Sequence, residues 1–150
     1  MTTRYLADFQ KKFRIDEFQI ACVHGWILSV RPSQLTLGSL VLSAQSGEES
    51  FTVLEAKTGL LEGFSISENM AKDVFGAVRI NVLCLMMQDP IVHFHIIPRY
   101  DKAVERYGEV WVDEAWPAPP DMSPKATKEQ TLRGIHQDLS RHLSQLQSRF

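Results

Sequence analysis

Two histidines stand one residue apart in a short apolar run, a spacing that suits shared chemistry. They are His93 and His95, in the segment VHFHIIPR at positions 92–99. On a strand, alternate side chains share a face, so both imidazoles point the same way while Val92, Phe94 and Ile96 point into a core. Two adjacent imidazoles are costly to bury without partners, which indicates a ligand, a metal or water beside them.

Three hypotheses fit this pair. In the first, one neutral imidazole attacks phosphorus while its neighbour binds an oxygen or handles protons, because histidine has a pKa of about 6.5. In the second, His24, His93 and His95 hold a zinc ion. No Cys or carboxylate follows the pair at ligand spacing, so the sequence predicts no metal site. In the third, both are surface histidines without a function.

The histidine segment resembles a known signature. Residues 93–99, HFHIIPR, resemble the end of the histidine-triad signature, in which three alternating histidines lead into an apolar pair and often Pro-Arg. The strand carrying Asn81 and the polar break after it are similar to that family's layout. Residues 24–32, HGWILSVRP, resemble the family's element of a histidine, an apolar strand and a basic residue before Pro. Residues 31–38, RPSQLTLG, look more like the bacterial diadenosine-tetraphosphate-hydrolase-like branch. The resemblance covers about residues 15–105.

The resemblance implies both an activity and residue roles. Family members bind nucleoside phosphates and cleave at the α-phosphorus through a nucleotidyl-histidine intermediate. His93 matches the nucleophile, and His95 matches the histidine that contacts phosphate oxygens. Asn81 matches an Asn that lies near the ribose-phosphate, and Gln88 matches a Gln that approaches the phosphate. His24 matches the histidine of the family's first strand pair. No cofactor is required, although Mg²⁺ can arrive with the substrate, and the resemblance implies a homodimer.

Two positions depart from the family pattern. Ile91 occupies the first triad position, where a histidine normally supports the nucleophile by hydrogen bonding. The Gly-rich loop before the histidines is reduced to Gln88-Asp89-Pro90. Both changes weaken catalysis more than fold, so an alternative function is a divergent module that binds nucleotide or a protein partner with little or no catalysis. Arg31 and Arg99 could pair with phosphate or be solvated charges at strand ends.

Apolar runs of strand length predict the sheet that must position these histidines. Residues 18–30 predict two strands, or one bent strand, broken at His24-Gly25, and residues 35–43 predict another. Residues 78–87 and 91–97 predict antiparallel neighbours joined by a tight turn at 88–90.

Helical periodicity appears in two places. Residues 51–75 predict one helix or two, the second beginning near Ser67 and capped by Gly76. Ser123-Pro124 predicts the start of a final helix whose apolar stripe packs on its own domain or on a second copy. The order of elements predicts an α+β, histidine-triad-like fold: an antiparallel sheet with helices packed on one side, plus a C-terminal helix.

Length and composition bound the remaining possibilities. The 150 residues suit one domain, with a core at about 15–105 and a C-terminal extension and helix at 106–150. The net charge of −2 gives no basic excess for nucleic acid. No signal peptide or membrane-spanning run stands in the sequence, so we expect a cytoplasmic protein with no membrane partner and with a nucleotide as its small-molecule substrate.

Overall fold

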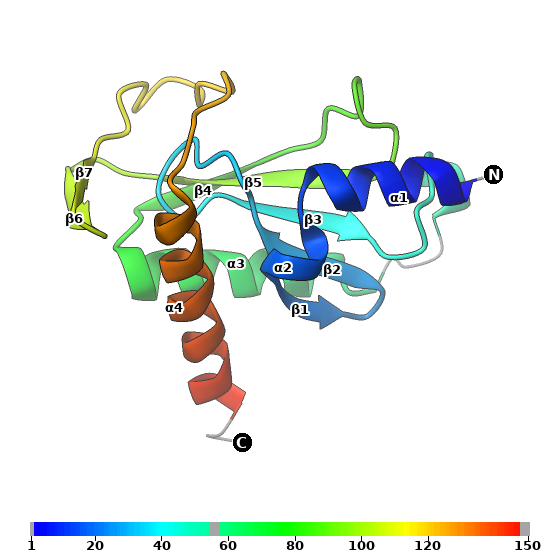
Figure 1. Cartoon of the computed structure of the whole chain (residues 1–150), viewed down its shortest axis with the longest axis horizontal. Helices are drawn as coiled ribbons and strands as arrows, with labels where there is room; N and C mark the ends of the chain where they lie inside the picture. The colour runs from blue at the N-terminus through cyan, green and yellow to red at the C-terminus, as the bar shows by residue number, and fades with distance from the viewer. Residues whose placement is uncertain (1, 55–57, 148–150) are drawn as a thin grey trace.

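Five strands form one antiparallel sheet in the order β1-β2-β3-β5-β4 (Figure 1). The computed structural model describes residues 2–54 and 58–147. A tight turn, with positive φ at His24 and Gly25, joins the first two strands at the predicted break. The predicted α+β fold is confirmed. The strands are β1 (Gln19–Val23), β2 (Trp26–Val30), β3 (Leu40–Ala44), β4 (Arg79–Leu83) and β5 (His93–Arg99).

The two faces of β5 carry different side chains, as the alternation predicted. Val92, just before the strand, and Ile96 are buried in the main core, and Phe94 packs against it. His93 and His95 lie on the opposite face, where the β3–β5 register sets them beside Ser43 and Val41. The alternation therefore separates the core face from the face that could carry chemistry.

Helix α3 (Leu60–Phe75) packs on the core face of the sheet as one continuous helix. The prediction that a second helix begins at Ser67 is wrong, because the Ser67 hydroxyl donates to the Gly63 carbonyl 2.7 Å away, one turn back in the same helix. Gly63 fits there because a Cβ would lie 2.8 Å from Leu42 Cδ2. Gly76 ends the helix in the left-handed conformation, as predicted. Residues 51–53 form a separate 3₁₀ turn, and 55–57 lie outside the described residues.

The C-terminal helix α4 (Glu129–Gln147) begins six residues after Ser123, so the predicted start is wrong. The segment before it is held by the loop after β2: the Lys125 backbone N–H donates to Ser33 Oγ at 2.8 Å, and the Gln34 N–H donates to Thr127 Oγ1 at 3.1 Å. The apolar stripe packs on its own domain, the first of the two predicted arrangements. Its buried members are Leu132, Ile135, Leu139 and Leu143.

Two connections differ from the predictions. The predicted strand at 35–43 shortens to β3, and Gly38 turns the chain with positive φ, close to the Phe75 ring. The predicted tight turn at 88–90 is also wrong, because residues 84–92 form a longer connection between β4 and β5. The end of this connection is bonded to β3 and the loop after it rather than folded back on β4. The Val92 N–H donates to the Glu48 carbonyl at 2.8 Å, and the Val92 carbonyl accepts from the Ala44 N–H at 3.0 Å.

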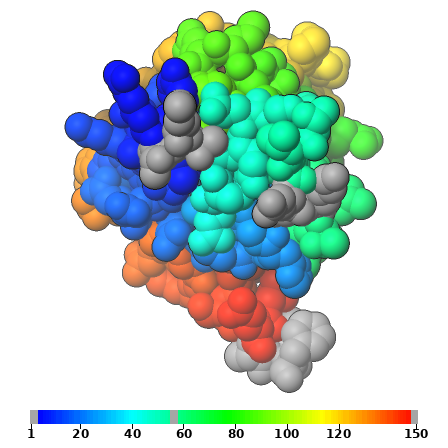
Figure 2. All heavy atoms as spheres, turned by 90° about the vertical axis from the view of Figure 1, so that its right-hand side faces the viewer, coloured from blue at the N-terminus to red at the C-terminus, as the bar shows by residue number. Residues whose placement is uncertain are grey.

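The histidine face is partly covered by two N-terminal helices, α1 (Thr2–Lys12) and α2 (Ile15–Phe18), which the sequence analysis did not assign. A second apolar cluster holds them to the sheet, and it includes Phe9, Phe13, Val41 and Ile91. Figure 2 shows the blue N-terminal helix beside the cyan segment after β3 and the green connection before β5.

A small hairpin of β6 (Val104–Arg106) and β7 (Glu109–Trp111) begins the C-terminal extension. Across residues 2–54 and 58–147, no helix has the length and apolar character to cross a membrane.

Candidate active site

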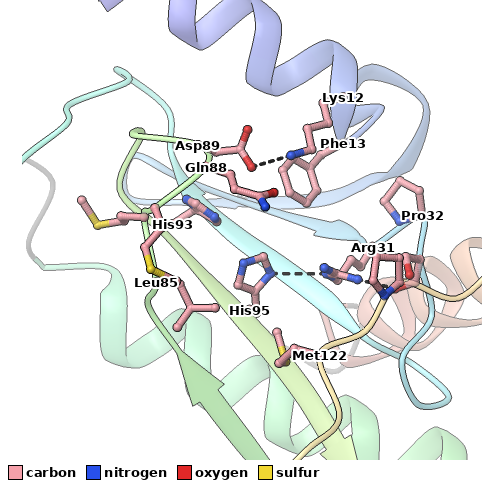
Figure 3. Close-up of a pocket in the computed structure, with 14 residues that line it drawn as sticks. Lys12, Phe13, Arg31, Pro32, Leu85, Gln88, Asp89, His93, His95 and Met122 are labelled. Carbon is pink, nitrogen blue, oxygen red and sulfur yellow. Dashed lines mark hydrogen bonds and ion pairs between the residues drawn. The ribbon is translucent and has the colours of Figure 1, made fainter.

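A cavity of about 390 Å³ lies beside both histidines (Figure 3). Segments far apart in the chain line it: the end of α1 and residue 13, residues 31–33 after β2, residues 85–89 of the β4–β5 connection, and Met122 with Pro124 of the extension. The histidines themselves are almost fully buried, with 2% of His93 and 6% of His95 exposed. The fold thus covers the face of β5 that carries the histidines and leaves a partly open cavity beside them.

The His93 ring is oriented by a backbone carbonyl. Its Nδ1 lies 2.5 Å from the Ile91 oxygen. A carbonyl only accepts hydrogen bonds, so Nδ1 carries the proton and Nε2 keeps its lone pair. Burial lowers the pKa of His93, the main effect on this ring, so the imidazole is neutral at pH 7. A neutral ring with an unprotonated Nε2 is the form that can act as a nucleophile.

Ile91, which stands where the resemblance predicts the first histidine, contributes to the site in two ways. Its side chain is completely buried in the apolar cluster with Phe9 and Phe13, beneath the end of α1. Its main chain supplies the oxygen that holds His93. The Ile91 side chain cannot form a hydrogen bond, but none is needed from it, because the Ile91 carbonyl sets the tautomer of the His93 ring.

The His95 ring has the opposite arrangement of proton and lone pair. Arg31 Nε donates to His95 Nδ1 at 3.3 Å, so a neutral His95 carries its proton on Nε2. Burial, helped by neighbouring His93 and Arg31, lowers the pKa of His95 to about 4. The two ring centroids lie 4.9 Å apart at an interplanar angle of 84°. The pair therefore offers one acceptor nitrogen and one donor nitrogen.

Arg31 and Gln88 add polar groups to the same cavity. Besides holding His95, Arg31 donates from Nη1 to the Ser33 carbonyl at 2.8 Å, and burial lowers its pKa. A guanidinium is well suited to phosphate oxygens, and a Gln amide can donate to them as well. The structure therefore brings predicted residues His93, His95 and Gln88 together with Arg31, for which the sequence had left open a phosphate contact or a solvated charge.

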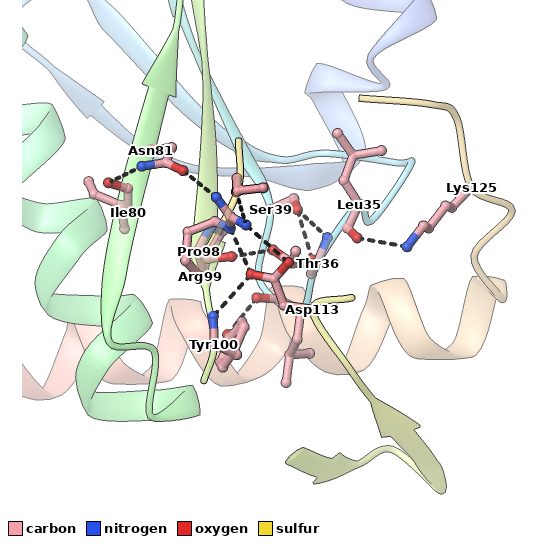
Figure 4. Close-up of polar contacts among 12 residues, drawn as sticks. Leu35, Thr36, Ser39, Ile80, Asn81, Pro98, Arg99, Tyr100, Asp113 and Lys125 are labelled. Atoms are coloured by element: carbon pink, nitrogen blue, oxygen red, sulfur yellow. Dashed lines mark hydrogen bonds and ion pairs between the residues drawn. The ribbon is translucent and has the colours of Figure 1, made fainter. Parts of the chain in front are cut away.

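Asn81 and Arg99, predicted to bind phosphate, lie together but outside the lining of this cavity (Figure 4). Arg99 donates from Nη1 to Asn81 Oδ1 at 2.7 Å and from Nη2 to the Ala118 carbonyl at 2.7 Å. Its Nε lies 2.6 Å from Asp113 Oδ2, and both side chains are only 3% exposed. These partners engage the guanidinium in anchoring the C-terminal extension to β4 and β5.

His24 is also not brought to the cavity. It lies in the turn between β1 and β2, where its exposed Nε2 is 3.2 Å from Glu62 Oε2. The hypothetical zinc set of His24, His93 and His95 is therefore not assembled. Within the part of the chain that the structure describes, no group of three or more His, Cys, Asp or Glu side chains could hold a metal ion.

The contribution of α1 to the cavity was not predicted from the sequence. Lys12 and Phe13 line the cavity, and the Phe13 ring centroid lies 5.9 Å from that of His93 and 6.2 Å from that of His95. The spacing of Leu6, Phe9 and Phe13 (i, i+3, i+7) is typical of an amphipathic helix and could have predicted it. Met122 reaches the cavity from the extension, and no local pattern marks it.

Comparison with solved structures identifies the fold. No protein-family model and no curated protein matched the chain. A histidine triad protein from Marinobacter aquaeolei is 21% identical, with a TM-score of 0.65, over 89% of this chain and 94% of that one. A hypothetical histidine triad nucleotide-binding protein from Sulfolobus tokodaii is 12% identical, with a TM-score of 0.62, over 95% and 93%. A zinc-bound histidine triad family protein from Mycobacterium smegmatis is 13% identical, with a TM-score of 0.53, over 84% and 86%.

These similarities define the class of fold: the chain has the α+β fold of histidine triad proteins. The likeness to a diadenosine-tetraphosphate-hydrolase-like branch has no counterpart in these structures and stays a prediction.

Proposed function

We propose that this protein is a nucleotidyl hydrolase that cleaves its substrate at the α-phosphorus through a covalent intermediate on His93. The observation that carries the proposal is the hydrogen bond from His93 Nδ1 to the Ile91 carbonyl, which leaves an unprotonated Nε2 on a residue that lines the cavity. The candidate substrates are dinucleoside polyphosphates and adenylylated small molecules, as in the diadenosine-tetraphosphate-hydrolase-like branch.

The first step forms the intermediate. His93 Nε2 donates its lone pair to the α-phosphorus, and the bond from phosphorus to the leaving oxygen or nitrogen breaks. The leaving group takes a proton from water, and the nucleotidyl group stays on the imidazole. The Nδ1–H bond to Ile91 stabilises the positive charge that develops on the ring.

The neighbouring groups stabilise charge on the phosphate oxygens. His95 Nε2–H, the Gln88 amide and Arg31 line the same cavity and are donors. In the second step, water attacks phosphorus, the bond to Nε2 breaks, and the water proton passes to solvent. The products are a nucleoside monophosphate and the protonated leaving group; Mg²⁺ is involved only if the substrate carries it.

Turnover of diadenosine tetraphosphate and of an AMP phosphoramidate tests the proposal. We expect His93→Asn to lose at least about 10³-fold in kcat, because the nucleophile is removed. His24→Asn, a matched change of a histidine outside the cavity, should keep wild-type turnover. Mass spectrometry of wild type denatured at alkaline pH, where a phosphorus–imidazole bond survives, should show a protein carrying one added AMP. Full turnover in His93→Asn would contradict the mechanism.

A second candidate function is nucleotide binding with little or no catalysis. The specific observation favouring it is the completely buried Ile91 at the first triad position, beside a nucleophile that is only 2% exposed. Calorimetry should then show AMP affinity while neither substrate turns over within hours. Activity gained in Ile91→His, with its fold checked by circular dichroism, would indicate an intact scaffold that lacks one group.

The proposal also includes a homodimer and a cytoplasmic location, which rest on the resemblance. Light scattering of the purified protein measures the mass directly, and a single-chain mass would contradict the dimer.

A further inference from the structure

An ion pair crosses the cavity between two segments that the chemistry above does not use. Lys12 Nζ, at the end of α1, lies 2.7 Å from Asp89 Oδ2 in the β4–β5 connection (Figure 3). Both residues line the cavity that contains the histidines. The Lys12 side chain is 51% exposed and that of Asp89 is 20% exposed, so the pair is open to solvent and can exchange partners.

The charged side chains that line the cavity leave a net charge of +1. Among the described residues that line it, the ionised side chains at pH 7 are Lys12, Arg31 and Asp89, because both histidines are neutral. Two nitrogens of Arg31 already donate to His95 and to the Ser33 carbonyl. Asp89 neutralises Lys12 and repels an anion, so the resting pair opposes phosphate binding.

We propose that Lys12 is a phosphate-binding residue of this site, held by Asp89 in the unliganded protein and transferred to the phosphate when a nucleotide binds. This inference rests on the proposed function, since it names a further ligand-binding residue of the same cavity. A Lys ammonium on a flexible stem can turn from one anion to another without backbone movement. Asp89 then faces solvent.

The arrangement also connects the ligand to the N-terminal helix. Phe13 follows Lys12 directly, and its ring lies beside both histidine rings. A phosphate bound by Lys12 would therefore hold the end of α1 against the reacting groups. Lys12 would act from an element that the histidine signature does not contain.

Calorimetry with AMP and with adenosine tests this role, because substitutions of Asp89 and of Lys12 should change AMP affinity in opposite directions. We expect Asp89→Asn to bind AMP roughly 10-fold more tightly, because Lys12 is released and a repelling charge is removed. We expect Lys12→Gln to bind AMP roughly 10-fold more weakly, because a charge-assisted contact is lost. Adenosine has no phosphate, so neither change should alter its affinity.

The double variant and two controls separate this role from a structural one. In the Lys12→Gln background, Asp89→Asn should improve AMP binding by much less than in wild type. Asp8→Asn and Lys11→Gln make the same charge changes on exposed positions of α1 and should leave AMP binding within about twofold of wild type.

Three results would overturn the inference. If the pair is a structural clasp, Asp89→Asn weakens AMP binding as Lys12→Gln does. If Asp89 acts only by repelling the phosphate, Asp89→Asn improves AMP affinity equally in the wild-type and Lys12→Gln proteins. If AMP binds none of the proteins, the proposed function fails with the inference, whereas AMP binding without the predicted signs contradicts the inference alone.

Discussion

Acidification should destabilise this protein through the buried histidines, and His95 allows the effect to be calculated. Its pKa is about 4 in the folded protein against 6.5 for an ordinary histidine. As pH falls below 6.5, the unfolded chain takes up a proton that the folded site does not accept. The stability contribution of the neutral ring is therefore present above pH 6.5 and is lost as pH falls towards 4.

The magnitude follows from these two pKa values. Between pH 7 and pH 5, the lost stability is about 2 kcal/mol for His95, from proton linkage with about 1.4 kcal/mol per pKa unit. His93 adds to it in the same direction, because burial lowers its pKa as well. A loss of this size is a large fraction of the stability of an ordinary domain.

Urea denaturation at pH 7 and pH 5 measures this effect. His95→Gln should lose about 2 kcal/mol less than wild type over that range, since it removes the titrating ring. His24→Gln, which removes an exposed histidine, should keep the wild-type difference because His95 remains. Equal pH dependence in wild type and His95→Gln would refute the argument that burial of this ring controls its protonation.

Two further predictions concern the arginines. Arg31→Gln should raise the His95 pKa by about one unit, because a nearby positive charge is removed. Arg79→Gln, on the exposed edge strand β4, should leave the His95 pKa unchanged, and NMR titration of the His95 ring measures both variants. Asp113→Asn should lower the free energy of unfolding by about 3 kcal/mol in urea, because the Arg99 charge stays buried without its carboxylate. A loss near zero would show that the other partners of Arg99 suffice.

Ile91 stands where the histidine-triad resemblance predicts the first histidine, and its backbone and side chain have separate roles. The side chain at this position fills an apolar cluster under α1, and the carbonyl at the same position orients His93. From the residue type alone, the change indicates loss of a hydrogen-bonding group. The structure places the Ile91 carbonyl against His93 Nδ1, a contact that favours the tautomer with an unprotonated Nε2.

Local patterns in the sequence were enough to predict the sheet and the central pair. Alternation along β5 placed His93 and His95 on one face and the core residues on the other, since side-chain direction in a strand depends only on position. The break at His24-Gly25 and the cap at Gly76 were also predicted, because positive φ is a property of the local chain. His93-x-His95 and the segment that follows it were sufficient to predict the class of fold.

Tertiary structure alone decided which other residues reach the histidines. Arg31 and Lys12 line one cavity with Gln88, which the resemblance had predicted, although Lys12 and Gln88 are 76 positions apart in the chain. Arg99 has the same charge as Arg31, yet Asp113 holds it elsewhere. Sequence spacing cannot distinguish these cases, because the partner of a charged side chain depends on contacts between segments distant in the chain, and packing sets those contacts.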